Sequence, residues 1–181
     1  MTVIKGQQVS LRPATISDRR QIFEWLAESD ITSNMLGPPH FPDNLVPGWE
    51  EFLSDYTDDY FGHGNPAVGR SFIIEFHGSQ AGHISYNLLD EETRTVEFDI
   101  WMAGSYWCNK GLGTDAINAL CGFLELSAGY KMFVLAPSLR NKGAVKAYQK
   151  CGFEPVEKPP PNFIPDYSDT IVLVRKAGMT R

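Results

Sequence analysis

The stretch Asn109-Lys110-Gly111-Leu112-Gly113-Thr114 decides the expected fold of this chain. It lies between an extended apolar run, Val96 to Met102, and a run with helical character, Asp115 to Leu126. Glycine lets backbone N–H groups come close to a ligand, and a helix that starts there presents its positive dipole end. The loop therefore predicts an anion site for a phosphate or pyrophosphate, with the charge of Lys110 beside it.

A Gly-x-Gly pair before a helix is also typical of a plain turn, so this loop alone does not decide a function. The glycine-lysine order of a P-loop is absent, and so is the third glycine of a dinucleotide fingerprint. A second motif, about thirty residues downstream, therefore has to carry part of the argument.

Length and composition favour one globular domain over residues 1–181. Hydrophobic residues make up 43% of the chain, which is enough for one core. No apolar run approaches the ~20 residues that span a bilayer, and Met1 to Gly6 lack the charged and apolar regions of a secretion signal. We therefore expect a cytoplasmic protein with no membrane partner.

The formal net charge of -6 argues against nucleic acid as a partner, because binding phosphates along a duplex needs a basic face. An acidic protein with a local anion site fits a phosphorylated cofactor and a cationic substrate. The three cysteines have neither a disulfide nor a zinc spacing, and the four histidines, His63 among them, are scattered. We therefore expect no metal site.

Periodicity and turn residues predict an alternation of strands and helices along the whole chain. A tight turn at Gly78-Ser79 would join two strands of an antiparallel meander. The expected strands are 9–13, 70–77, 80–89, 94–102, 130–135, 153–156 and 170–175, and the expected helices are 18–29, 47–60, 113–128 and 142–151.

The second motif lies in Ala136 to Phe153, where Asn141 and Ala144 precede Ala147-Tyr148-Gln149-Lys150-Cys151-Gly152-Phe153. Together with Asn109 to Thr114, it resembles the GCN5-related N-acetyltransferase (GNAT) family, whose element order is similar from Val9 to about Arg175. The resemblance implies an α/β (α+β) fold of the GNAT acyl-CoA N-acyltransferase type. Its central mixed sheet would have six to seven strands, splayed between two parallel strands, with helices on both faces.

The same resemblance implies acetyl-CoA as co-substrate, lying where strands 96–102 and 131–136 splay apart. The pantetheine arm would pair with the backbone of β-strand residues and with Asn141, and the pyrophosphate would sit on the glycine loop. Tyr148 would point at the thioester sulfur. The implied cofactor-binding residues are Ile100, Trp101, Met102, Asn109, Lys110, Gly111, Leu112, Gly113, Thr114, Asn141, Ala144 and Tyr148.

Two positions depart from the family pattern. Cys108 stands where the family usually has Gln or Arg three residues before the first motif glycine, so one backbone-supporting or phosphate contact is expected to be missing. Ala136 stands where aminoglycoside-modifying relatives often have an acid, which removes one candidate contact to the acceptor.

The chemistry calls for a base, because an aliphatic amine with a pKa near ~10 must lose a proton before it attacks the thioester directly. Glu97 and Asp99 are two residues apart in a strand and project to one face. We expect Asp99 to be the base or the amine anchor, with Glu97 or a water relay as alternatives. The resemblance implies that Tyr148 protonates or hydrogen-bonds the leaving thiolate. A solvated acidic face and a core tyrosine are the plain structural alternatives.

Within the family, the segments Val9 to Pro13, Phe98-Asp99-Ile100 and Pro165-Asp166 resemble those of aminoglycoside 6'-N-acetyltransferases. Acidic side chains suit a polycationic sugar and aromatic rings could wall its site. The expected substrate-binding residues are Trp49, Tyr86, Asp99, Trp101 and Asp166, with Asp55, Asp58, Asp59 and Phe163 as further candidates.

Three other functions stay open at this point. The acceptor could be a protein N-terminus or a hydroxylysine-type amine of siderophore assembly, and a non-catalytic acetyl-CoA-binding module is a minor alternative. The expected partner is a small-molecule amine, antibiotic resistance is the expected role, and the chain is expected to be a monomer or a homodimer.

Overall fold

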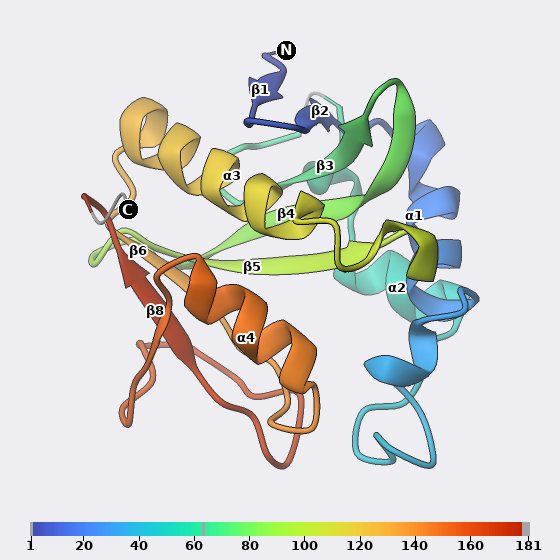
Figure 1. Cartoon of the computed structure of the whole chain (residues 1–181). Helices are drawn as coiled ribbons and strands as arrows, with labels where there is room; N and C mark the ends of the chain where they lie inside the picture. The colour runs from blue at the N-terminus through green and yellow to red at the C-terminus, as the bar shows by residue number, and fades with distance from the viewer. Residues whose placement is uncertain (1, 63, 179–181) are drawn as a thin grey trace.

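A mixed sheet of eight strands forms the centre of the computed structural model, which describes residues 2–62 and 64–178 (Figure 1). Met1 and His63, both considered above, lie outside the described residues. The strand order is β1-β2-β3-β4-β5-β6-β8-β7. The strands are β1 Ile4–Lys5, β2 Ser10–Pro13, β3 Gly69–Phe76, β4 Ser79–Asp90, β5 Thr95–Met102, β6 Met132–Leu135, β7 Glu154–Pro155 and β8 Leu173–Lys176.

Neighbouring strands of the sheet pair antiparallel, except β5 and β6, which pair parallel. The expected fold class is confirmed. The predicted number of strands, six to seven, is too small because the two-residue strand β1 was not predicted. The hairpin turn between β3 and β4 is His77-Gly78, one residue earlier than predicted. Both residues have positive φ, at 47° and 78°, as a two-residue hairpin turn of the primed type requires.

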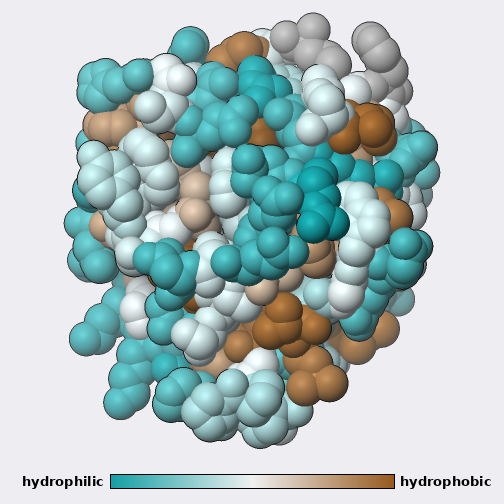
Figure 2. All heavy atoms as spheres, turned by 90° about the vertical axis from the view of Figure 1, so that its right-hand side faces the viewer, coloured by the Kyte–Doolittle hydropathy of each residue, from teal (hydrophilic) through white to brown (hydrophobic). Residues whose placement is uncertain are grey.

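Helices cover both faces of the sheet (Figure 1). The helices are α1 Arg19–Ala27, α2 Trp49–Asp55, α3 Leu112–Ala128 and α4 Lys142–Lys150. On one face, α3 buries Leu112, Ile117 and Leu120 against sheet residues such as Ile84 and Phe98. On the other face, α1 and α2 bury a second apolar cluster of Ile22, Phe23, Trp25 and Phe52 against Ile73 and Trp101. The sheet therefore separates two cores. On the side of the molecule that carries α1 and α2, the outer surface is mostly hydrophilic (Figure 2).

Helix α2 is much shorter than the predicted helix 47–60. Tyr56 leaves the helical region at φ -103° and ψ 72°, and only a short 3-10 turn, Asp58–Tyr60, follows. The guanidinium of Arg19 in α1 donates to the carbonyl of Tyr56 and pairs with Asp58 at 2.8 Å. A side chain from another helix thus satisfies the carbonyl at the end of α2, which a local sequence pattern does not reveal.

One carboxylate fixes the start of α3 to the segment between β1 and β2. Asp115 accepts hydrogen bonds from the backbone N–H groups of Gln7, Gln8 and Val9, at 2.7 to 2.9 Å. A Cβ at Gly6 would stand 2.6 Å from this carboxylate, so the turn before β2 needs glycine there. These contacts hold the first turn of α3 and the preceding glycine loop in place.

Candidate active site

The sheet opens between its two parallel strands. β5 and β6 pair only at Thr95–Met132, Val96–Phe133 and Glu97–Val134, while β5 continues to Met102 on its other neighbour, β4. Beyond Glu97, the β6-facing edge of β5 therefore has no strand partner, and Figure 1 shows the two strands diverging toward α4. The predicted splay is confirmed, although it begins before Asp99 rather than after it. Backbone groups on such an edge need hydrogen-bond partners from a ligand or solvent.

A cavity of about 1040 Å³, here called cavity one, lies along this opening. Its wall contains the open edge of β5 from Ile100 to Met102, the glycine loop and the inner side of α4. Gly111 adopts φ 78°, which glycine tolerates best, and no side chain caps the start of α3. The uncapped N–H groups there fit a phosphate group, so cavity one suits the diphosphate and pantetheine arm of acetyl-CoA.

The structure brings most predicted cofactor-binding residues together in the wall of cavity one. They are Ile100, Trp101, Met102, Asn109, Gly111, Leu112, Gly113, Thr114, Asn141, Ala144 and Tyr148. Lys110 is the exception, because its Nζ lies 3.4 Å from the centre of the Tyr106 ring and its side chain does not line the cavity. Its positive charge is occupied in a cation–π contact outside the wall.

A smaller cavity of about 250 Å³, cavity two, lies on the α1 and α2 face of the sheet. Five carboxylates from α2, β5 and a late loop line it: Glu51, Asp55, Glu97, Asp99 and Asp166. Both cavities are lined by Ile100, Trp101, Asn141 and Tyr148, so they meet at the opened edge of β5. The two cavities are therefore neighbours along this edge.

Asp99 lies in the wall of cavity two, next to Ile100 on the opened edge of β5. Its Oδ2 accepts a hydrogen bond from the hydroxyl of Tyr56 at 3.1 Å. Burial, followed by the charge of Asp166, raises the pKa of Asp99 from 3.8 to about 6, although the Tyr56 hydrogen bond works in the other direction. Burial and the charge of Asp99 raise the pKa of Glu97 to about 8. At neutral pH, Asp99 is mainly ionised and Glu97 mainly protonated.

Tyr148 and Asn141 both come from the α4 segment. The side chain of Asn141 caps α4 by accepting from the N–H of Ala144 at 3.1 Å, which leaves its amide N–H₂ able to donate. Burial, followed by the charge of Tyr167, raises the pKa of Tyr148, so its hydroxyl stays protonated at neutral pH. The two residues thus offer hydrogen-bond donors at the junction of the cavities.

The remaining predicted acceptor residues lie elsewhere. The Tyr86 hydroxyl donates to the carbonyl of Pro66, and its ring packs beside Phe72 in the core. Trp49 packs edge-on against Phe23, 5.2 Å between ring centres, outside both cavities. Among the further candidates, Asp58, Asp59 and Phe163 also lie outside both cavity walls. The structure therefore does not bring these side chains to Asp99.

Sequence reasoning missed Tyr56 and Glu51. Glu51 lies four residues before Asp55, so their shared helical face was a signal that could have been used. Tyr56 carried no such signal, because its contact with Asp99 joins residues 43 apart in the chain. Its ring also meets that of Trp101 at 90°, with 5.8 Å between centres, and thereby forms part of the floor of cavity two.

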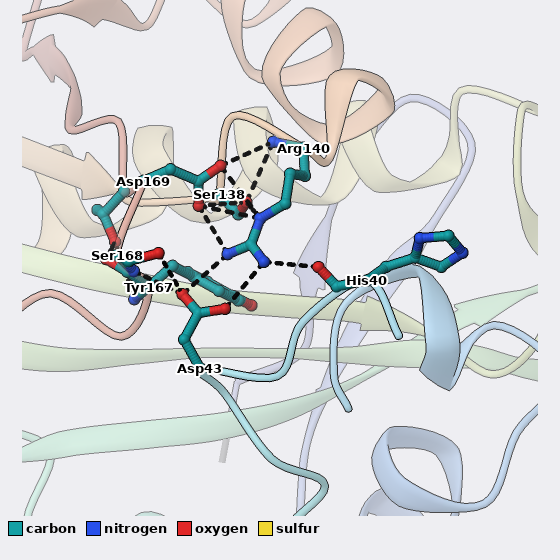
Figure 3. Close-up of polar contacts among 8 residues, drawn as sticks. His40, Asp43, Ser138, Arg140, Tyr167, Ser168 and Asp169 are labelled. Atoms are coloured by element: carbon teal, nitrogen blue, oxygen red, sulfur yellow. Dashed lines mark hydrogen bonds and ion pairs between the residues drawn. The ribbon is translucent and has the colours of Figure 1, made fainter. Parts of the chain in front are cut away.

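Arg140 was also missed, and it joins two loops beside the site (Figure 3). Its guanidinium donates two parallel hydrogen bonds to Asp43, at 2.8 and 2.9 Å, and a further one to Asp169 at 2.8 Å. It also lies over the ring of Phe41, 4.8 Å from the centre. The hydrogen bonds from Arg140 lower the pKa of both carboxyl groups. This cluster, the Arg140 clamp, fixes loop 37–46, part of which walls cavity two.

Two further findings concern metals and membranes. No group of three or more His, Cys, Asp or Glu side chains within residues 2–62 and 64–178 is arranged to hold a metal ion. None of the helices in the described part of the chain has the length and apolar content of a membrane span.

Comparison with known proteins places these features in context. A sequence profile described as an acetyltransferase (GNAT) domain matches residues 8–154. The L-amino acid N-acetyltransferase AaaT of Escherichia coli K12 is 22% identical over 148 residues, covering 81% of this chain and 83% of that protein.

Two solved structures share the fold at low identity. AAC(6')-Ib in complex with paromomycin and acetyl-CoA has a TM-score of 0.73 at 21% identity, covering 94% of both chains. RimL, a ribosomal-protein α-N-acetyltransferase in complex with coenzyme A, has a TM-score of 0.72 at 16% identity, covering 97% of this chain and 98% of its own.

Proposed function

Because this chain belongs to the GNAT acetyltransferase family and is an acetyl-CoA-dependent N-acetyltransferase, we propose that its acceptor is a polycationic primary amine of the aminoglycoside 6'-amine type. One observation carries the proposal, which is the charge of the two cavity walls. Cavity one is lined by Arg140, Lys142, Lys146 and Lys150 and by no carboxylate, whereas cavity two is lined by five carboxylates and by no Lys, Arg or His among the described residues.

This division suits an anionic cosubstrate on one side and a cationic acceptor on the other. Repulsion among the ionised carboxylates of this wall, which exclude the mainly protonated Glu97, would destabilise it unless a ligand brought positive charge. The pKa of Asp166 is raised by burial and by the charge of Asp55, and that of Asp99 by burial and by Asp166. An acceptor with several ammonium groups relieves this repulsion more fully than one with a single ammonium.

In the proposed reaction, acetyl-CoA supplies an acetyl group activated as a thioester. Asp99 accepts a proton from the ammonium group of the acceptor, so that the neutral amine can attack directly. Glu97, which is mainly protonated at neutral pH, orients the acceptor by hydrogen bonding. Tyr148 donates a hydrogen bond from its protonated hydroxyl to the sulfur of the leaving CoA thiolate. Asn141 donates from its amide to the pantetheine arm.

The first α3 turn holds the phosphate end of the cosubstrate. No side chain caps the N–H groups of Leu112, Gly113 and Thr114 at the start of this helix, so a diphosphate bound at the glycine loop can accept from them. The open β5 edge at Ile100 to Met102 offers backbone hydrogen bonds to the pantetheine amides. We propose that residues 1–181 form one domain, which the continuous sheet from β1 to β8 supports.

Other acceptors fit less well. A free amino acid carries a carboxylate, and cavity two offers no cationic side chain among the described residues to receive it. A protein N-terminus brings one ammonium group, which would leave most of the five carboxylates unpaired. The siderophore-type amine stays an open prediction, as do the cytoplasmic location, the oligomeric state and a role in resistance. The non-catalytic module is set aside, because this chain is an acetyl-CoA-dependent N-acetyltransferase.

An acceptor panel tests the proposal. CoA release is measured with purified protein, acetyl-CoA and one amine at a time, namely a kanamycin-type aminoglycoside, a peptide with N-terminal Ala, an L-amino acid and a lysine analogue. We expect the aminoglycoside to give the highest kcat/KM, and Asp55→Asn to raise its KM. Asp59→Asn, an exposed acid outside both cavities, is the matched control. Turnover with the peptide alone would overturn the polycation proposal.

A further inference from the structure

Helix α4 presents a row of three lysines to cavity one. Lys142, Lys146 and Lys150 are spaced four residues apart, which places them on one side of the helix, and all three line the cavity wall at its exposed rim. Within the described part of the chain, none of the three forms an ion pair. The nearby Arg140 differs, because Asp43 and Asp169 already hold its charge.

Folding alone does not explain this row. Like charges four residues apart on a helix repel each other. Lys150 in the last turn complements the helix dipole, but Lys142 lies in the first turn, where a positive charge opposes it. The first turn of α4 contains no acidic residue that would compensate. In a chain with 22 Asp and Glu against 16 Lys and Arg, three unpaired lysines on one wall indicate a ligand that brings negative charge.

The row also lies close to the place assigned to the diphosphate. The thiol of Cys151, the residue after α4, donates to the carbonyl of Thr114 in the first turn of α3 at 3.7 Å. Lys150 therefore stands at the α3 end of cavity one, and Lys142 is ~12 Å farther along the helix axis. Coenzyme A carries a third phosphate on its ribose, beyond the diphosphate that the α3 N-terminus accommodates.

Lys110, the lysine of the glycine loop, cannot replace this row in the conformation observed. Its Nζ is held over the Tyr106 ring at 3.4 Å and its side chain is absent from the cavity wall. The lysine charge that faces cavity one therefore comes from α4 and not from the glycine loop.

We infer that Lys142, Lys146 and Lys150 bind the 3'-phosphate of coenzyme A, so that the protein discriminates acetyl-CoA from its 3'-dephospho form. The α3 N-terminus and glycine loop supply the contacts to the diphosphate, which both forms share. The lysine row supplies the contact that only the phosphorylated ribose can use. This inference rests on acetyl-CoA as cosubstrate and is independent of the acceptor.

Equilibrium binding tests the inference without catalysis. The dissociation constants of CoA and of 3'-dephospho-CoA are determined by isothermal titration calorimetry, without any amine, for the wild type and for a variant with Lys142→Gln, Lys146→Gln and Lys150→Gln. Lys158→Gln changes an exposed lysine that lines neither cavity and is the matched control. The three single variants show which lysine contributes most, and circular dichroism checks that α4 remains folded.

We expect the wild type and Lys158→Gln to bind CoA about tenfold more tightly than dephospho-CoA at low salt, the effect of a few exposed ion pairs. The triple variant should lose this preference while its affinity for dephospho-CoA stays unchanged. Added salt should weaken the preference of the wild type and of Lys158→Gln. Equal loss of affinity for both ligands would assign the lysines to the diphosphate and overturn the inference. So would a wild type that does not distinguish the two ligands. Failure of the aminoglycoside assay would leave this result unaffected.

Discussion

Replacement of Asp99 by asparagine should remove activity and at the same time stabilise the fold at neutral pH. Because Asp99→Asn keeps the shape of the side chain, the Tyr56 hydroxyl can still donate to the amide oxygen that replaces the carboxylate oxygen. What disappears is a buried negative charge near Asp166 and Asp55. The variant therefore separates the chemical role of the carboxylate from its structural one.

The effect on stability follows from the raised pKa. A change from 3.8 to about 6 corresponds to ~3 kcal/mol that the ionised group costs the folded protein. The pKa is higher in the folded state, so this cost is absent below about pH 3.8, grows between pH 3.8 and 6, and is complete above pH 6. Asp99→Asn should thus raise the free energy of unfolding at pH 7 by up to ~3 kcal/mol, with little change near pH 4.

Ionisation of Asp99 above pH 6 lowers the stability of the fold but supplies the base that the reaction needs. With a pKa of about 6, Asp99 is about nine-tenths ionised at pH 7 and about one-tenth ionised at pH 5. A general base contributes about 10² to 10⁴ in rate. The ratio of wild-type to Asp99→Asn activity should therefore be large and flat above pH 7 and fall about tenfold between pH 7 and pH 5. The ratio cancels the ionisation of the acceptor amine.

The assay is CoA release between pH 4.5 and 8.5, paired with denaturant unfolding at pH 4 and pH 7. Asp59→Asn serves as control. Its rate of CoA release and its free energy of unfolding should equal those of the wild type at every pH. A ratio that is independent of pH would exclude Asp99 as the titrating base and move that role to Glu97 or to a water relay. An Asp99→Asn protein that is less stable than the wild type at pH 7 would contradict the burial argument.

Four further variants probe single contacts. Tyr56→Phe removes a hydrogen bond that favours the ionised form of Asp99, so the acid limb of the kcat profile should move to higher pH. Tyr148→Phe should lower kcat at least tenfold, as measured by CoA release, with little change in the dissociation constant of CoA. Gly111→Ala forces alanine into φ 78°, so denaturant unfolding should show a free energy of unfolding that is lower by about 1 kcal/mol. Calorimetry should show a higher dissociation constant for CoA in the same variant. Arg140→Ala opens the clamp on loop 37–46, which should raise the acceptor KM and speed limited proteolysis in that loop, while an unchanged proteolysis rate would show that the loop holds without it.

Local signals account for the parts of the protein that were predicted. The glycine loop, the α3 start and the Asn141 cap of α4 depend on residues within one or two turns of each other, so their spacing can be read along the chain. The alternation of strands follows from side-chain periodicity in the same way. The eighth strand, β1, was missed because two residues carry no period, and α2 was drawn too long because Arg19 ends it from another helix.

The acceptor side of the site shows where such signals stop. Tyr86 and Trp49 were predicted at the site from their chemistry, but the sheet register directs Tyr86 into the core and α2 packs Trp49 against Phe23. Tyr56 was not predicted, although it holds Asp99. Neither its partner nor its orientation follows from neighbouring residues.

The sequence by itself determined the fold class, through the periodicity of its strands and helices, and the family, through a resemblance carried by two short motifs. It also predicted an anion site at the start of α3, because that site depends on a few adjacent residues and on the conformational freedom of glycine. Only the tertiary structure decided that five carboxylates from α2, β5 and a late loop share one wall while the lysines of α4 face another. Those side chains are brought together by the packing of α2 on the sheet and by the separation of β5 from β6. The electrostatic energy behind the ligand proposed for each cavity depends on distances between residues far apart in the chain, and these exist only once the chain has folded.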